Sequence, residues 1–263
     1  MPEGHVIHRL ARGLTREIGD GPVEATSPQG RFAQGAALLH GEQLVRAGAW
    51  GKYLFVDWTG GHCLHVHLGL IGKFREVGSE PPPPRASIRL RLRNERSCWD
   101  LTGPNRCELI TPAERREIVS QIGADPLRRN PDVRRARAAF ARTSVPVGAL
   151  LLDQKVIAGL GNIYRAEILF LCGIHPLRPS NRIDYVEFEE IWAQSVRLLR
   201  IGLRTGRIIT TDPAEIGRPR SRMTAEDTLY VYHREHCRRC GTALGSVALA
   251  GRPIEFCPSC QPR

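Results

Sequence analysis

Four cysteines near the C-terminus constrain the fold of this chain more than any other feature. Cys237 and Cys240 are separated by two residues, and Cys257 and Cys260 repeat that spacing after sixteen intervening residues. Two Cys-x2-Cys turns can place four thiolates at the corners of a tetrahedron, which is the arrangement of structural zinc sites. A pair of disulfides is the alternative interpretation, but disulfides are rare in reducing compartments. We therefore expect one structural Zn²⁺ per chain, with a β-hairpin over the segment GTALGSVALAGRPIEF between the two turns.

The charge balance indicates a negatively charged partner. Lys and Arg number 38 against 27 Asp and Glu, which gives a net charge of +11 and a pI near 9.8. Such an excess is typical of nucleic-acid binding and, less often, of binding to an anionic membrane surface. No apolar run is long enough to span a bilayer, and the N-terminus lacks the layout of a signal peptide. We expect a cytoplasmic, nucleoid-associated monomer with no membrane partner.

The N-terminal part of the chain has the pattern of a β-sandwich with one helix. Residues 6–14 have apolar spacing that fits a helix. The segments KYLFVDW, HCLHVHLGL and ASIRLRLRN alternate or run apolar as strands do, with WTGGH as a hairpin turn between the first two. The run of prolines at 81–84 must lie in a loop or edge connection. We assign residues 1–115 to this domain and residues 116–128 to a linker.

The rest of the chain is predicted to be helical up to the cysteine module. Helices are expected in TPAERREIVSQI, in NPDVRRARAAFART with Asn130 as cap and Pro131 in its first turn, in VGALLLDQ, in NIYRAEILFLCG ended by Gly173, and over residues 181–204. A polar, mobile loop is expected to follow them. We assign residues 129–222 to a helical DNA-binding domain and residues 223–263 to the zinc hairpin, so the fold class is α+β. The scattered cysteines are expected to be buried thiols: Cys63, Cys98, Cys107 and Cys172.

The sequence AGLGN precedes a predicted helix and has the character of an anion site. A glycine turn at a helix start directs free N–H groups and the positive end of the helix dipole toward an anion. Lys155 before this turn and Asn162 after it add donors for a phosphate diester. Arg252, near the turn of the predicted hairpin, is a second phosphate-bridging candidate. An ordinary turn and a solvated arginine are the alternatives.

The first residues, MPEGHVIHRL, allow two interpretations. Chain ends usually fray and have no function. Alternatively, removal of Met1 frees Pro2 as a secondary amine, next to the carboxylate of Glu3. Such an amine condenses with an aldehyde to give an iminium, which is an electron sink. The ten residues by themselves leave both interpretations open.

Further candidate functional residues lie at or near the ends of predicted strands, and each of them also has an ordinary structural explanation. Lys52 lies in a predicted turn of WGKYLF and by itself is an ordinary hairpin lysine. In HVHLGL, His65 and His67 fit core or hydrogen-bonded histidines better than metal ligands. Leu70 precedes Gly72 in a tight connection, where it is either buried or an exposed apolar wedge.

Four separated segments resemble the formamidopyrimidine-DNA glycosylase and endonuclease VIII family. They are the start PEG, the lysine of GKYLF, the segment QKVIAGLGNIYRAE and the ending GRPIEFCPSCQ, in the family's order over almost the whole chain. The start PEG, in place of PEL, indicates the endonuclease VIII branch, and PEGHVIHRLA resembles an actinobacterial subgroup of it.

This resemblance implies a bifunctional DNA glycosylase and AP lyase of base excision repair. Pro2 corresponds to the nucleophile that attacks C1′ of a damaged nucleoside, with an amine pKa of roughly 8. Glu3 corresponds to the general acid and base, and Lys52 to a loop lysine that contacts DNA and assists catalysis. An iminium on Pro2 followed by β- and δ-elimination is implied, with no redox cofactor. The branch implies oxidised pyrimidines as the excised bases.

The resemblance also implies how DNA is held. Lys155, Asn162 and Arg252 match residues that bind phosphates around the lesion, and Leu70 matches a wedge that fills the gap left by the flipped base. The helical domain resembles the family's helix–two-turn–helix module, and the four cysteines resemble its zinc finger. The loop from Thr210 to Arg222 is implied to contact the flipped base.

Two positions depart from the family pattern. Val6, preceded by His5, occupies a position where members commonly carry a second glutamate, so a proton-handling role usually placed there is absent or moved. DLTGPNRCEL does not match the loop that usually supplies two further gap-filling residues, and Arg106 is only a weak candidate for one of them. This second departure predicts single strands, bubbles or forks as substrates in preference to duplex DNA.

A protein of another class explains part of the same pattern. A non-catalytic, zinc-containing protein that binds damaged or structured DNA accounts for the charge, the hairpin and the phosphate turn. It gives no function to Pro2 and Glu3. A zinc-ribbon regulator or RNA binder leaves the whole N-terminal half unexplained.

Overall fold

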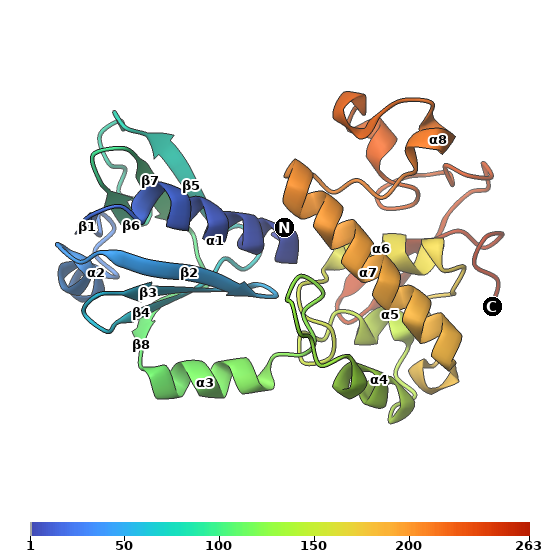
Figure 1. Cartoon of the computed structure of the whole chain (residues 1–263). Coiled ribbons are helices and arrows are strands. Elements are labelled where there is room, and N and C mark those ends of the chain that lie inside the picture. Colours follow the sequence, from blue (N-terminus) through green and yellow to red (C-terminus); the bar gives the residue numbers. More distant parts are fainter. Residues whose placement is uncertain (1) are drawn as a thin grey trace. The chain divides into compact units, whose positions relative to one another are not determined.

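The computed structural model describes residues 2–263, so the expected removal of Met1 concerns a residue outside this range. The chain divides into two compact units, Met1–Gln121 and Ile122–Arg263, each with its own hydrophobic core (Figure 1). None of the helices between residues 2 and 263 is long and apolar enough to cross a membrane.

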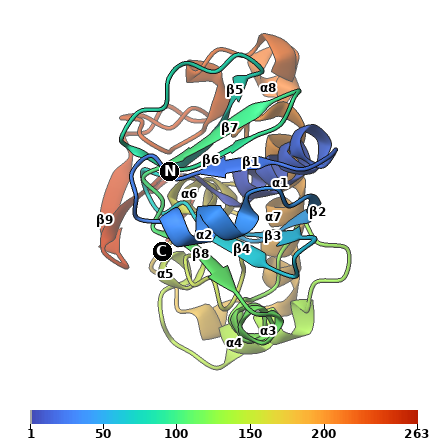
Figure 2. The ribbon, with the colours of Figure 1, turned by 90° about the vertical axis from the view of Figure 1, so that its left-hand side faces the viewer.

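The first unit is a sandwich of two four-stranded antiparallel sheets, seen from another side in Figure 2. One sheet has the strand order β2 (Leu44–Trp50), β3 (Tyr53–Trp58), β4 (Cys63–His67) and β8 (Arg106–Ile110). The other has the order β1 (Glu24–Thr26), β6 (Ile88–Arg93), β7 (Cys98–Thr102) and β5 (Lys73–Gly78). The unit also contains helices α1 (Gly4–Ile18), α2 (Ala33–Leu39) and α3 (Pro112–Gln121).

One core joins the two sheets and α1. Alternate residues of β3 and β4 point into it, among them Leu54 and Val66, and Leu90 and Leu101 enter from the other sheet. Because one cluster takes side chains from both sheets, the sheets lie face to face. The buried face of α1 repeats every three to four residues, as the predicted helix required, but the helix is longer at both ends. The predicted β-sandwich with an N-terminal helix is confirmed.

The second unit combines helices with a β-hairpin in a single core. Its helices are α4 (Val133–Ala141), α5 (Val147–Leu150), α6 (Asn162–Leu171), α7 (Tyr185–Thr205) and α8 (Pro213–Ile216), with 3-10 turns η1 (Ser180–Arg182), η2 (Arg220–Arg222) and η3 (Glu226–Thr228). The hairpin strands are β9 (Gly245–Leu249) and β10 (Arg252–Phe256). Ile254 and Cys257 belong to the same core cluster as residues of α6 and α7, so the hairpin packs on the helices.

Two helix starts differ from the sequence expectation because another residue provides the cap. The expected cap of α4 was Asn130, but Asp132 accepts a hydrogen bond from the backbone N–H of Arg135 at 3.0 Å. The helix therefore begins at Val133. α7 begins at Tyr185 instead of residue 181, because Asp184 and Glu187 form a reciprocal capping box with bonds of 2.9 and 3.0 Å.

The polar segment after α7 was expected to be an irregular loop, and it contains three short helices. We call residues 211–229 the 211–229 loop. Asp212 caps α8 by accepting a hydrogen bond from the backbone N–H of Ala214 at 2.8 Å, and Pro213 fits the first turn. Local capping thus gives this loop helical structure that its composition did not predict.

The scattered cysteines are free thiols, as expected. Cys63 and Cys98 are buried, whereas Cys107 and Cys172 are only partly buried. Burial raises the pKa of Cys63, Cys107 and Cys172 to about 12. These thiols are therefore unreactive at neutral pH.

Candidate functional site

The N-terminal tip is packed into the first unit. The side chain of Glu3 is fully buried, and its carbonyl accepts a hydrogen bond from the backbone N–H of Val6 at 2.9 Å. Glu3 occupies the cap position of α1, at the positive end of the helix dipole, and Pro2 precedes it, partly exposed. Because the buried residues of α1 anchor the helix in the core, the position of the tip is set by the fold. This favours the second interpretation of the opening residues.

Lys52 lies at the same end of the first unit as this tip. It occupies the two-residue turn between β2 and β3, where Gly51 has a φ of 54°. α1 and β2 run antiparallel, because Gln43 bonds to the carbonyl of Gly19 and Ala47 bonds to the hydroxyl of Thr15. From that contact, five strand residues to Lys52 span about 17 Å and twelve helical residues back to Glu3 span about 18 Å. Figure 1 shows the start of α1 and the β2–β3 turn at one end of this unit.

His67 is a residue of this region that the sequence analysis set aside. It ends β4 directly opposite Tyr53, the residue after Lys52. Burial, with the charges of His65 and Lys52, lowers the pKa of His67, so its ring is neutral and close to Lys52. Its Nδ1 accepts a hydrogen bond from the backbone N–H of Gly69 at 3.2 Å. The sequence did contain a signal for His67, because a histidine ends the strand that was expected to pair with the strand after Lys52.

His65, by contrast, is a structural histidine. It is buried, its Nδ1 lies 3.0 Å from the carboxylate of Glu108, and its ring stacks on Phe55 and Tyr53. Burial lowers its pKa. These contacts occupy it within the sheet and indicate no ligand.

Leu70 lies at an exposed tip that follows β4. Leu70 is 59% exposed and its neighbour Ile71 is 78% exposed. Two glycines shape the tip: Gly69 has a φ of 68°, and a Cβ on Gly72 would lie 2.2 Å from the carbonyl of Leu68. The structure thus places two adjacent aliphatic side chains in solvent, of which the sequence analysis named only Leu70. Arg106 lies on β8 opposite His67, 3.4 Å from Glu108.

In the second unit, the AGLGN turn connects a tightly bonded loop to the buried start of α6. Gly159 has a φ of 94°, and its N–H donates to the side chain of Gln154 at 2.9 Å. Asn162, the first residue of α6, is buried and donates from Nδ2 to the carbonyl of Pro253 at 3.1 Å. Its Oδ1 has no hydrogen-bond partner within residues 2–263. Lys155 is exposed on the same loop.

Arg165 joins this helix to the hairpin, and the sequence analysis did not single it out. Its fully buried guanidinium donates to the carbonyls of Gly148, Leu249, Arg252 and Pro253 at 2.9 to 3.3 Å. Arg252 is the first residue of β10, after a turn in which Ala250 and Gly251 have positive φ. The structure therefore brings Asn162 and Arg252 to one α6–hairpin junction. Pro2, Glu3, Lys52 and Leu70 belong to the other unit.

The four C-terminal cysteines form one cluster. All four sulfur atoms lie within 4.8 Å of one another, with Sγ–Sγ distances of 3.5, 3.6 and 4.0 Å for three of the pairs. A tetrahedral site with Zn–S bonds of 2.3 Å requires sulfurs roughly 3.8 Å apart. A disulfide requires roughly 2.05 Å, so the paired-disulfide alternative is excluded. The cluster fits one tetrahedral metal ion.

Comparison with known proteins identifies the family. The formamidopyrimidine-DNA glycosylase N-terminal domain matches residues 1–107, and the H2TH domain of the same enzymes matches residues 122–214. A Mycobacterium tuberculosis protein named "Endonuclease 8 1" is 43% identical over 267 residues, covering 99% of this chain and 100% of its own. The chain belongs to the formamidopyrimidine-DNA glycosylase family.

Other members of the glycosylase family agree over the full length. The formamidopyrimidine-DNA glycosylase of Methylococcus capsulatus is 32% identical over 275 residues, covering 99% of this chain and 100% of its own. The Lactococcus lactis glycosylase, solved non-covalently bound to DNA containing an AP site, has a TM-score of 0.80 at 25% identity over 99% of this chain and 100% of its own. The resemblance drawn from the four sequence segments is confirmed, including its endonuclease VIII branch.

Proposed function

We propose that this protein is a bifunctional DNA glycosylase and AP lyase of base excision repair that excises oxidised bases, chiefly pyrimidines. Membership of the glycosylase family supports the reaction class. The observation that carries the proposal is the packed tip, in which Glu3 is fully buried at the start of α1 and Pro2 precedes it. A protein that only bound DNA would have no use for a buried carboxylate beside a terminal proline.

In the proposed reaction Pro2 is the nucleophile. The damaged nucleotide is flipped from the duplex, because C1′ is inaccessible within the stack. The Pro2 nitrogen bonds to C1′ as the bond from C1′ to the base breaks, and the Pro2 N–H proton goes to the departing base. Glu3 protonates the sugar ring oxygen as the ring opens, which leaves Glu3 as a carboxylate and Pro2 as an iminium. The iminium accepts the electrons of the C2′–H bond while the Glu3 carboxylate takes the proton, so the 3′ phosphate leaves by β-elimination. The 5′ phosphate leaves by δ-elimination, and a one-nucleotide gap remains.

The contacts to DNA are proposed from charge and position. Lys155, Asn162 and Arg252 bind phosphates at the α6–hairpin junction, where the N-terminus of α6 favours an anion. Lys52 binds near the reacting sugar, and Leu70 is the wedge that fills the gap in the stack. Residues 129–222 and the hairpin of residues 223–263 together hold the duplex, and the +11 charge suits a nucleoid protein.

Zn²⁺ is the proposed occupant of the Cys237, Cys240, Cys257 and Cys260 cluster, with a structural role. Zn²⁺ prefers four thiolates in a closed tetrahedral site, and such sites contribute directly to folding. The thiolates lie at the base of the hairpin that carries Arg252. The ion would therefore fix the hairpin and take no part in bond cleavage.

The segment DLTGPNRCEL bears on the form of the DNA substrate. Since it does not match the loop that usually supplies two gap-filling residues in the family, we propose that single strands, bubbles or forks are cleaved faster than duplex DNA. Excision from matched oligonucleotides in these forms measures this preference. Equal or faster cleavage of the duplex contradicts it.

Borohydride trapping tests the proposed function. The intact protein, with Met1 shown by mass spectrometry to be absent, is incubated with duplex DNA carrying thymine glycol or an AP site. A covalent adduct is expected for the wild type and for Pro22→Gly, a control proline of the same unit, but not for Pro2→Gly. Tight DNA binding with no adduct on any lesion would favour the non-catalytic alternative.

A further inference from the structure

Glu167 is a fully buried carboxylate that the proposed reaction does not use. It lies on α6, and no cation pairs with it among the residues that the structure describes. Burying a carboxylate without a counter-ion costs several kcal/mol unless hydrogen bonds offset the loss of water. The groups that surround Glu167 must therefore explain why it is there.

Four donors surround this carboxylate, and all come from the two ends of the 211–229 loop. Oε1 accepts from the backbone N–H groups of Val231 and Tyr232 at 2.8 and 2.9 Å. Oε2 accepts from the N–H of Tyr230 at 2.8 Å and from the hydroxyl of Thr210 at 2.5 Å. Thr210 precedes the loop and Tyr230 follows it. One side chain thus holds both ends of the loop against α6.

Direct bonds between the two ends close the loop at the same place. The N–H of Thr210 donates to the carbonyl of Thr228 at 2.9 Å, and the hydroxyl of Thr211 donates to the carbonyl of Asp227 at 2.7 Å. Beyond these bonds the loop is a compact excursion whose Met223 is buried in the core of the second unit. Its geometry at the base is therefore fixed relative to Glu167.

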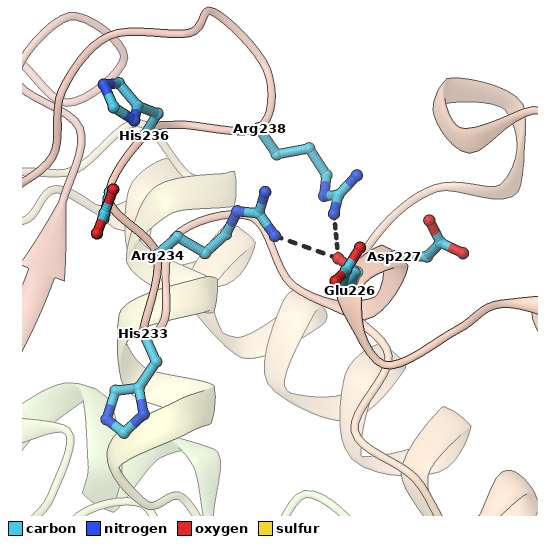
Figure 3. Close-up of a pocket in the computed structure, with 7 residues that line it drawn as sticks. Glu226, Asp227, His233, Arg234, His236 and Arg238 are labelled. Carbon is cyan, nitrogen blue, oxygen red and sulfur yellow. Dashed lines mark hydrogen bonds between the residues drawn. The ribbon is translucent and has the colours of Figure 1, made fainter.

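A second, exposed set of bonds holds the C-terminal end of the loop to the segment that leads into the cysteine module (Figure 3). Arg234 and Arg238 both donate to the backbone carbonyl of Glu226, and Arg238 Nε also donates to the carbonyl of Leu229 at 3.0 Å. These arginines line an open cavity of about 570 Å³. Because these bonds are partly exposed to water, the buried carboxylate is the stronger constraint.

We propose that Glu167 is the positioning residue of the 211–229 loop. It fixes both loop ends relative to Asn162, which lies five residues earlier on the same helix, so that the loop meets the flipped base while α6 binds a phosphate. The proposal deepens the proposed function and depends on it, since the loop is taken to face the flipped base. Glu167 touches neither DNA nor the reacting atoms in this role.

Because only donors surround the carboxylate of Glu167, its replacement by an amide tests the proposed role directly. Backbone N–H groups only donate, and both carboxylate oxygens face at least one of them. Glu167→Gln keeps the volume of the side chain but must turn an NH2 group toward one set of donors. Thr210→Val removes the hydroxyl bonds to Glu167 and, at 3.1 Å, to the carbonyl of Thr228 but leaves the three N–H bonds to Glu167, whereas Thr210→Ser keeps all of them. Glu190→Gln, at an exposed position of α7, is the matched control.

Three measurements distinguish a positioning role of Glu167 from a general effect on stability. Hydrogen exchange at the amides of residues 230–232 is expected to quicken about ten-fold or more in Glu167→Gln, and less in Thr210→Val. Single-turnover release of thymine glycol from duplex DNA is expected to slow about ten-fold. Cleavage of an AP site in the same duplex, which offers no base to the loop, is expected to stay within about two-fold of wild type. Thr210→Ser and Glu190→Gln should match the wild type in all three.

Two results would overturn the proposal. One is an equal fall in base release, AP-site cleavage and DNA affinity in Glu167→Gln and Thr210→Val, which marks a purely structural residue. The other is unchanged exchange and unchanged base release. Failure of the proposed function is distinguishable, because then the wild type gives no adduct through Pro2 on any lesion, whatever the exchange at residues 230–232.

Discussion

At the scale of single residues, burial gives Glu3 a different environment from most carboxylates of the first unit. Glu3 is 0% exposed, whereas Asp20 and Glu42, for example, lie on the surface. A carboxylate out of water is strongly influenced by the few groups around it, and general acids are tuned in this way. We therefore expect proton transfer by Glu3 to contribute a large part of the rate.

Replacement of Glu3 tests that expectation. Glu3→Gln keeps the size and polarity of the side chain but cannot exchange a proton, so single-turnover base release is expected to fall by about 10²–10⁴-fold. Rapid-quench kinetics on duplex DNA with thymine glycol measures the change. Affinity for DNA and the thermal midpoint serve as controls and should be nearly unchanged. A rate within about three-fold of wild type would remove Glu3 from the mechanism.

His5, next to Glu3, predicts how stability depends on pH. Burial, with the charge of Arg9, lowers the pKa of His5 to about 4, below the value of about 6.5 in the unfolded chain. As the pH falls below 6.5 the unfolded chain takes up the proton first. Stability that is present above pH 6.5 is therefore lost between pH 6.5 and 4, by up to about 3 kcal/mol.

Urea denaturation of the wild type and His5→Gln at pH 7.5 and pH 5 measures this loss. The glutamine does not titrate, so the variant should lose less stability on acidification than the wild type. Other buried histidines contribute equally to both proteins and cancel in the difference. Identical pH dependence in the two proteins would show that His5 is accessible to protons in the folded state.

The sequence identified site residues that stand in short motifs, and missed those whose partners are distant. Pro2, Glu3, Lys52 and Asn162 could be named because each lies in a segment with its own chemistry. Arg165 and Glu167 could not, because all of their described partners except Gly148 and Thr210 lie more than 60 residues away along the chain. A charged residue in an apolar helix signals a special role, but its role is defined only by the chain that packs against it.

At the scale of elements, α6 organises the second unit. Its first residue, Asn162, lies at the AGLGN turn. Arg165 donates hydrogen bonds to the hairpin, and Glu167 accepts hydrogen bonds from both ends of the 211–229 loop. The rest of the helix is apolar and belongs to the core. Three polar residues within two turns therefore connect three segments that we propose to face DNA.

Removal of Arg165 should loosen the hairpin. Arg165→Met keeps the apolar stem but removes a buried guanidinium that donates to four carbonyls, of which that of Gly148 is fully buried, so we expect the free energy of unfolding of the second unit to fall by about 3 kcal/mol. Exchange of the β9 and β10 amides should quicken and the affinity for DNA should fall. The exposed Arg200→Met on α7 is the control and should change stability by about 0.5 kcal/mol or less. Unfolding of the two variants at the same urea concentration would refute the role of Arg165.

Element types followed from the sequence better than element limits. The alternation in KYLFVDW and the period of α1 identify their buried faces directly. The starts of α4 and α7 were misplaced because several residues near each start can cap a helix, and only the folded backbone shows whether Asp132 or Asn130 does so. The short helices of the 211–229 loop were missed because local caps outweigh its weak helical composition.

At the scale of the whole molecule, the two units have separate cores, and this predicts their unfolding. Two cores that share no cluster unfold as separate cooperative units when the link between them is weak. Calorimetry of the zinc-loaded protein should therefore show two transitions. Because the cysteine cluster belongs to the core of the second unit, excess chelator should lower only one of them.

Cys240→Ser identifies that transition without chelator. It should lower the same transition, since it removes one thiolate of the four. Cys98→Ser, at a buried thiol of the first unit, should lower the other. A single transition that shifts as one in every case would show that the two units unfold together.

The sequence pattern predicted two kinds of domain but not how the strands are ordered. β1 pairs with β6 and β4 pairs with β8, across gaps of some sixty and forty residues. Such pairings depend on which sheet edge is available after the hairpins form, and no local pattern records this.

The closed base of the 211–229 loop makes it an exchangeable cassette. Because Glu167 holds Thr210 at one end and the amides of residues 230–232 at the other, the exposed residues between them can be replaced with little effect on the scaffold, provided that the buried Met223 is kept. Natural divergence and laboratory selection can therefore vary the loop while the reacting groups stay in place. A new base preference can then arise when the loop changes and the residues that hold its two ends stay the same.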